Sequence, residues 1–123
     1  MGRDFKNLVA WQKGDDLAVA VYQATRRFPS DETYGLHSQM RRSALSVPAN
    51  IAEGSGKRTL CDRCASFDIA MGELNELEYH IHLAHRLGYF DDTTAASLEQ
   101  LRADTARPLA GLLKMLTQQI EHP

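Results

Sequence analysis

Apolar residues recur every three or four positions along most of the chain, which is the spacing of one face of an α-helix. Four segments show this pattern, and none shows the sustained alternation of apolar and polar residues that is typical of a β-strand. The four stripes are Leu8, Trp11, Leu17, Ala18, Val21 and Thr25; Leu36, Met40, Ala44, Val47 and Ile51; Phe67, Ala70, Met71, Leu74, Leu77, Ile81, Ala84 and Leu87; and Leu98, Leu101, Thr105, Leu109, Leu112, Leu116 and Ile120. The pattern predicts an all-α fold of four helices.

Residues that start and end helices flank the first two stripes. Asn7 is expected to cap the first helix, and Phe28-Pro29 to end it, because the residue before a proline disfavours helical geometry. Ser30-Asp31-Glu32 is expected to open the second helix, since its acids suit the positive end of the helix dipole. Gly54-Ser55-Gly56 is expected to close it.

The last two stripes carry similar signals. The third helix is expected to start around Thr59 to Asp62 and to end at Gly88, a natural C-terminal cap. The fourth is expected to begin near Asp91 or Asp92. Connections of a few residues favour antiparallel neighbours, so residues 1–123 are predicted to form one domain, an antiparallel up-down-up-down four-helix bundle.

A glycine and two prolines interrupt these stripes. A glycine inside a helix costs about 1 kcal/mol relative to alanine, so we interpret Gly14 as a close approach of another helix. Pro48 is expected to kink the second helix near residues 44–48, because it cannot donate to the carbonyl of Ala44. Pro108 is expected to bend the fourth helix or divide it in two.

The distribution of charge along the chain is more informative about function than the overall composition. The 123 residues include 14 Lys and Arg against 16 Asp and Glu, a formal net charge of -2, whereas a stand-alone nucleic-acid binder is usually strongly basic. Residues 1–63 carry ten basic and seven acidic residues, and residues 64–123 carry four and nine. The halves are therefore +3 and -5.

The chain shows no sign of a secreted or membrane protein. Its start is polar, and its longest apolar run, residues 17–22, is far too short to span a bilayer. Its two cysteines imply no disulfide framework. We therefore expect a reduced, cytoplasmic protein without membrane contact.

Two short motifs could carry chemistry. Gly54-Ser55-Gly56-Lys57 resembles the tail of a phosphate-binding loop, but Ile51 stands where that motif needs glycine and Arg58 where it needs Ser or Thr. Cys61 and Cys64 have the spacing of a redox pair or half a zinc site, without the second cluster that a structural zinc site needs. We interpret them as a connecting loop and as two incidental thiols, with a metal or redox role for the cysteines left open.

Histidines gather on the predicted third helix, at His80, His82 and His85. Glu78, His82 and His85 share one face of that helix, but the Glu-x-x-His pattern of a bundle di-metal site occurs nowhere in the chain. A solvated polar face is the interpretation we favour over a metal site. No catalytic, cofactor-binding or metal-binding residues are predicted, no cofactor is expected, and the protein is expected not to be an enzyme.

Basic residues remain as candidates for function. Seven lie near the first connection, the second helix and the second connection: Arg26, Arg27, Arg41, Arg42, Lys57, Arg58 and Arg63. Two interpretations stay open, namely ordinary solvated side chains and one basic surface that contacts nucleic-acid phosphates.

Several short motifs resemble the bacterial four-helix-bundle family of the 23S rRNA intervening-sequence proteins. They are Leu8-Val9-Ala10-Trp11-Gln12-Lys13, Val21-Tyr22, Phe28-Pro29, Tyr34-Gly35-Leu36, Gln39-Met40-Arg41-Arg42-Ser43-Ala44, Ser46-Val47-Pro48-Ala49-Asn50-Ile51-Ala52-Glu53-Gly54 and Leu87-Gly88-Tyr89. The resemblance covers about residues 5–90, and the Pro-x-Asn-Ile-Ala-Glu-Gly block is its most specific part. The fourth helix matches only as an apolar pattern.

The resemblance implies a small cytosolic bundle, commonly reported as a ring-like homopentamer. The resemblance also implies that family members are encoded within intervening sequences of ribosomal RNA genes. A related branch supplies accessory proteins to diversity-generating retroelements, and these accessory proteins are basic and bind reverse transcriptase and nucleic acid. Asn50 and Glu53 fall in the specific block, and we expect them to satisfy backbone groups that a kink at Pro48 releases.

These observations lead to one hypothesis and one alternative. The hypothesis is a non-enzymatic, homo-oligomeric bundle that acts as a binding or scaffold module, with RNA, DNA or a nucleic-acid-processing protein as partner. The alternative is a purely structural or protein-interaction oligomer without nucleic-acid contact, which arginines engaged in salt bridges would favour.

Overall fold

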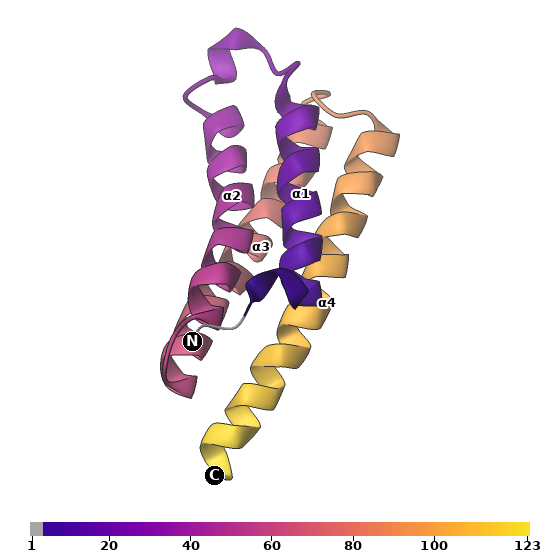
Figure 1. Ribbon diagram of the computed structural model, residues 1–123. Helices are drawn as coiled ribbons and strands as arrows, with labels where there is room; N and C mark the ends of the chain where they lie inside the picture. The colour runs from indigo at the N-terminus through magenta and orange to yellow at the C-terminus, as the bar shows by residue number, and fades with distance from the viewer. Residues whose placement is uncertain (1–3) are drawn as a thin grey trace.

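The computed structural model describes residues 4–123, which form four long helices and no β-strand. They are α1 (Val9–Thr25), α2 (Leu36–Ser55), α3 (Leu60–Arg86) and α4 (Asp92–Glu121). Two 3-10 turns, η1 (Phe5–Asn7) and η2 (Ser30–Glu32), precede α1 and α2. Each long helix runs antiparallel to the one before it (Figure 1), so the predicted up-down-up-down bundle is confirmed.

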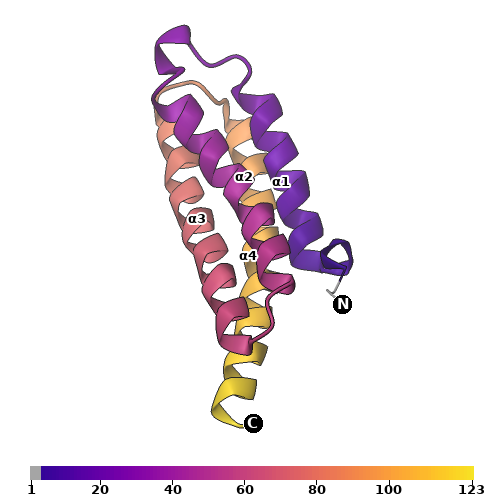
Figure 2. The same cartoon turned by 60° about the vertical axis from the view of Figure 1, so that its left-hand side comes forward.

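The four helices stand at the corners of a square. Helices α1 and α3 each pack against both α2 and α4, and the backbones of the diagonal pairs of these four helices lie farther apart. Figure 2 shows the bundle from a second side. The predicted stripes line the space between them, where Leu17, Met40, Leu74 and Leu109 are fully buried. Burial of each such side chain contributes about 1.5–3 kcal/mol. Leu87 and Ile120, each the last residue of its predicted stripe, are exposed instead.

The first helix starts later than predicted. Asn7 lies inside η1, whose first residues are capped by the Asp4 carboxylate, and α1 begins at Val9. The Phe5 ring packs edge-on against Trp11, with 5.0 Å between the ring centroids. Leu8 holds the N-cap position of α1 without a side-chain hydrogen bond, so Asn7, the last residue of η1, does not cap that helix.

The second helix also starts later than predicted, and the first ends earlier. Helix α1 ends at Thr25, before Phe28-Pro29, and residues 30–32 form η2 while α2 begins at Leu36. The N-cap residue of α2 is Gly35, and the Glu32 carboxylate accepts a hydrogen bond from the Leu36 amide of the first turn at 3.1 Å. The other oxygen of Glu32 accepts from the Tyr89 hydroxyl at 2.8 Å. A partner 57 residues away therefore holds the acid that starts α2.

The remaining helix ends agree with prediction. The Thr59 hydroxyl accepts from the Asp62 amide at 3.0 Å, and the Asp91 carboxylate accepts from the Thr94 amide at 2.7 Å. Gly88 follows α3 with a φ of 78°, a conformation that favours glycine. Helix α2 ends at Ser55 and is capped by Gly56.

Gly14 marks a close helix approach, as predicted. A Cβ atom there would lie 3.3 Å from Val47 Cγ1 and 3.7 Å from Pro48 Cα, and α1 is unbroken. Pro48 lies inside an unbroken α2, and Pro108 inside an unbroken α4. The suggestion that Pro108 divides the fourth helix is therefore wrong.

Candidate binding surfaces

Arg41 braces α2 against α1. Its Nε donates to the Thr25 hydroxyl at 2.8 Å, and its Nη2 donates to the Tyr22 carbonyl at 3.0 Å. The guanidinium also lies over the Tyr22 ring, with Cζ 4.5 Å from the centroid, a favourable cation–π distance. All of these partners are neutral, so the positive charge of Arg41 has no carboxylate partner within the described residues.

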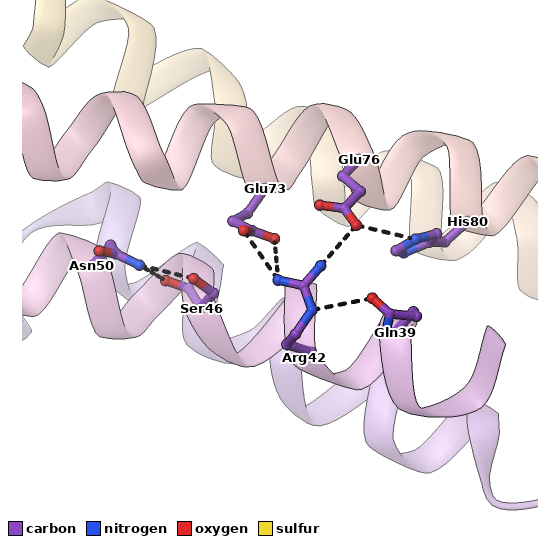
Figure 3. A network of polar contacts seen from close by, with 7 residues as sticks. All are labelled: Gln39, Arg42, Ser46, Asn50, Glu73, Glu76 and His80. Carbon is purple, nitrogen blue, oxygen red and sulfur yellow. Dashed lines mark hydrogen bonds and ion pairs between the residues drawn. The ribbon is translucent and has the colours of Figure 1, made fainter. Parts of the chain in front are cut away.

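Arg42 braces α2 against α3 on the opposite side (Figure 3). Its two terminal nitrogens lie 3.3 Å from a Glu73 oxygen and 2.7 Å from a Glu76 oxygen, and its Nε donates to Gln39 at 3.2 Å. The hydrogen bond to Glu76 raises the pKa of the guanidinium further above its usual range. This arrangement fixes two helices and leaves little of the charge of Arg42 for another molecule.

His80 completes this cluster. Its Nε2 lies 3.6 Å from the Glu76 oxygen that pairs with Arg42, while its buried Nδ1 has no partner among the described residues (Figure 3). Burial lowers the pKa of the imidazole, Glu76 acts in the opposite sense, and Arg42 adds to the lowering. His80 is therefore a neutral packing residue at pH 7, not part of an exposed polar face.

The specific Pro-x-Asn-Ile-Ala-Glu-Gly block makes contacts within its own helix. The Asn50 amide donates to the carbonyl and the hydroxyl of Ser46, both at 2.8 Å (Figure 3). Pro48 releases the carbonyl of Ala44, so Asn50 serves a different backbone group from the one we expected. Glu53 lies 3.4 Å from Lys57, an exposed ion pair one turn apart.

The other candidate cations reach the surface near the two ends of α2. Arg26 and Arg27 follow α1, whereas Lys57, Arg58 and Arg63 lie around the connection from α2 to α3. The twenty residues of α2 span roughly 30 Å, so the candidates form separate groups rather than one patch. Arg63 donates to the Lys57 carbonyl at 2.8 Å. The side chains of Arg26, Arg27 and Arg58 make no hydrogen bond or ion pair with residues 4–123.

An open groove of about 780 Å³ runs between α3 and α4. Ile81 and Ala95 form its apolar floor. It is also lined by Asn75, Glu78, Tyr79, His82, His85, Asp92, Ala96 and Glu99. Glu78, His82 and His85 share a face as predicted, and His85 pairs with Asp92 across 2.6 Å.

Arg102 lies behind this groove and was not anticipated. It is only 9% exposed, and it pairs with Glu99 at 2.6 Å and with Glu78 at 2.8 Å. Its hydrogen bonds to Glu99 raise the pKa of the guanidinium. A signal was present in the sequence, because Arg102 sits four residues after Leu98 and three before Thr105, within an apolar stripe.

The surroundings of Cys64 do not activate its thiol. Cys61 is exposed and Cys64 half-buried, both in reduced form, and burial raises the pKa of the Cys64 thiol. A raised pKa leaves less of the nucleophilic thiolate. Within residues 4–123, no group of three His, Cys, Asp or Glu side chains is placed to hold a metal ion. In the same range, no helix is both long and apolar enough to cross a lipid bilayer.

Comparison with known proteins identifies the fold and the family. A crystal structure from Bacteroides thetaiotaomicron, of a protein with unknown function from the S23 ribosomal protein family, superposes with a TM-score of 0.80. It is 24% identical, and the alignment covers 86% of this chain and 96% of that one. No curated protein matches the chain. The sequence model for the 23S rRNA-intervening sequence protein family matches residues 6–111, extending past the resemblance into α4, and the chain belongs to this family.

Proposed function

We propose that this protein is a non-enzymatic, homo-oligomeric four-helix bundle that acts as a binding or scaffold module, with nucleic acid or a nucleic-acid enzyme as its partner. The main support for the proposal is that most of the candidate basic side chains have no acidic partner. Only Arg42 and Lys57 among the seven candidate cations form an ion pair within residues 4–123. Five positive side chains therefore keep uncompensated charge in a chain with a net charge of -2.

Homo-oligomerisation makes a weak, scattered set of cations effective. Each copy offers Arg26 and Arg27 near one end of α2 and Arg58 near the other. Symmetry repeats these groups, and a nucleic acid that contacts one copy meets the next at high effective concentration. The braces made by Arg41 and Arg42 keep the three neighbouring helices in a defined arrangement, which suits a scaffold.

A filter-binding titration with structured RNA and duplex DNA tests this function. The Arg26→Ala/Arg27→Ala/Arg58→Ala variant is expected to bind more weakly than the unchanged protein. Its log affinity is expected to depend less on log salt concentration, by about 0.9 for each duplex phosphate that the variant no longer neutralises. Arg107→Ala is the matched control, because Arg107 is exposed but pairs with Asp104 at 3.0 Å. Absence of binding to either nucleic acid near physiological salt would contradict the proposal.

A purely structural or protein-interaction oligomer is the second candidate. The ion pairs of Arg42 with Glu73 and Glu76 favour it, because they use a family-motif arginine to join α2 to α3. This candidate predicts an assembly in light scattering together with no nucleic-acid binding in the titration. A monomer that binds nucleic acid would contradict both candidates as stated.

A further inference from the structure

Three exposed apolar side chains lie on the outer surface of α1 and α2. Val19 and Leu45 are 51% and 55% exposed, and Tyr22 is 36% exposed. Val19 lies one turn before Tyr22 on α1, and Leu45 lies one turn after Arg41 on α2. The Arg41 guanidinium over the Tyr22 ring joins the two pairs. We call these four residues the α1/α2 strip.

The α1/α2 strip carries positive charge at one end. Arg41 bonds only to the Thr25 hydroxyl and the Tyr22 carbonyl, so no carboxylate neutralises it within residues 4–123. Asp15 lies one turn before Val19 and bounds the strip at its other end. The Tyr22 end therefore presents a cation beside an exposed aromatic ring.

The groove between α3 and α4 has the complementary character. Ile81 and Ala95 give it an apolar floor. Glu78 and Glu99 both pair with the guanidinium of Arg102, so these three side chains together carry one net negative charge. The Asp92 side chain is 98% exposed, lies 2.6 Å from His85 Nε2 and adds a further carboxylate at the rim. An apolar surface with adjacent positive charge is what this groove is suited to bind.

We propose that the α1/α2 strip of one copy of this chain docks into the α3/α4 groove of a second copy. This inference rests on the proposed homo-oligomer and names the two surfaces that build it. A groove-to-groove contact would oppose the carboxylates of Glu78, Glu99 and Asp92, and a strip-to-strip contact would leave these carboxylates without a cation from the other copy. Docking of the strip into the groove brings Arg41 to them, so we infer a heterologous contact, which joins different surfaces of the two copies.

Two variants disable the surfaces one at a time. Val19→Gln/Leu45→Gln replaces the apolar part of the strip with neutral helix-forming residues, and Ala96→Arg adds bulk and positive charge to the groove. Each is expected to weaken self-association at least about tenfold in sedimentation equilibrium, because the apolar anchors are removed or cannot enter. The matched controls, Leu87→Gln and Ala110→Arg, change exposed residues outside both surfaces and are expected to assemble normally.

Mixing the two disabled variants gives the decisive result. The strip variant keeps an intact groove, and the groove variant keeps an intact strip, so the mixture is expected to form a 1:1 heterodimer in native mass spectrometry. Either variant alone is expected to remain monomeric at that concentration. Tyr79→Ser, which removes an exposed ring of the groove without adding bulk, is a second groove variant should Ala96→Arg fail to fold.

The outcomes separate this inference from the proposed function. If the unchanged protein assembles but the mixture yields no heterodimer, the pairing of strip with groove is wrong and the homo-oligomer stands. If one disabled variant assembles as the unchanged protein does, a symmetric contact through the other surface replaces the proposed one. If the unchanged protein is monomeric at all concentrations measured, the homo-oligomer itself is wrong.

Discussion

His80 is an ionisable side chain in the packed interface between α2 and α3. Only 7% of the residue is exposed, and its Nδ1 has no partner within the described part of the chain. Burial lowers the pKa of this imidazole below 6.5, so the folded protein holds His80 neutral while the unfolded chain takes up a proton near that pH. The unfolded state then binds more protons than the folded state as the pH falls.

The free energy of unfolding is therefore expected to fall as the pH drops below about 6.5. This fall is expected to end once the pH is below the lowered pKa of His80 in the folded protein. Urea titrations between pH 7.5 and 5 measure this slope. His80→Leu is expected to flatten it, leaving a smaller slope from His37, whose pKa burial also lowers. His82→Leu removes an exposed imidazole of the same helix and serves as the control. An unchanged slope in His80→Leu would show that His80 is not the group responsible.

Adjacent arginines illustrate what could be predicted at the scale of single residues. Arg41 and Arg42 both appear in the sequence as cations beside a buried stripe, and periodicity places them on different sides of the helix. Arg41 bonds to Thr25, 16 residues earlier, and Arg42 bonds to Glu76, 34 residues later. No local sequence pattern distinguishes an arginine that links two helices from a solvated one, because its partner comes near only when the two helices pack.

At the scale of helices, Gly54 sets how closely α2 approaches α3. A Cβ atom at this position would lie 2.7 Å from Cε1 of Phe67 and 2.9 Å from Cβ of Ser66. Phe67 is 2% exposed, so its ring has no room to move away. Gly54→Ala is expected to destabilise the protein by about 1–3 kcal/mol in urea unfolding, because the better helix propensity of alanine is outweighed by overpacking.

Gly72 provides a control for this prediction within the neighbouring helix. Beyond the adjacent backbone of its own helix, no described atom lies within 4 Å of a Cβ placed at Gly72, which is exposed on α3. Gly72→Ala is expected to stabilise the protein by up to about 1 kcal/mol, since only helix propensity changes. The same substitution, glycine to alanine, is therefore expected to change the free energy of unfolding in opposite directions at the two positions. Equal effects would contradict the role of Gly54 in helix packing.

Helix interiors could be predicted from the sequence better than helix starts. The apolar stripes depend on a period that repeats over many residues, and a single misplaced residue does not change it. The start of α2 depends on one carboxylate, Glu32, held by Tyr89 from the far end of α3. Ser30 carries the better local capping signal, because serine is a preferred N-cap residue and glutamate is not. The first amide of α2 nevertheless donates to Glu32, whose other oxygen accepts from Tyr89, a contact that no local pattern announces.

At the scale of the whole molecule, the last turns of α4 extend beyond the end of the other three helices (Figures 1 and 2). The family match ends at residue 111, ten residues before the helix does. The extension nevertheless belongs to the core at its base. Leu116 is only 3% exposed, and together with Leu112 it closes a small enclosed space of about 20 Å³ lined also by Leu8 and Phe67.

A chain shortened to end at Gly111 is therefore expected to lose stability although it keeps the whole family match. Removing Leu112 and Leu116 opens the base of the core to water, and the loss of two largely buried leucines costs about 3–6 kcal/mol in urea unfolding. A chain that ends at Thr117 keeps both leucines and is expected to remain within about 0.5 kcal/mol of the full chain, since residues 118–123 are exposed. If the two shortened chains were equally stable, the extension would be an appendage and the family boundary would also be the physical one. The expected difference instead places the end of the stable bundle near Leu116, because the base of the core needs the apolar stripe of α4 to continue past the matched segment.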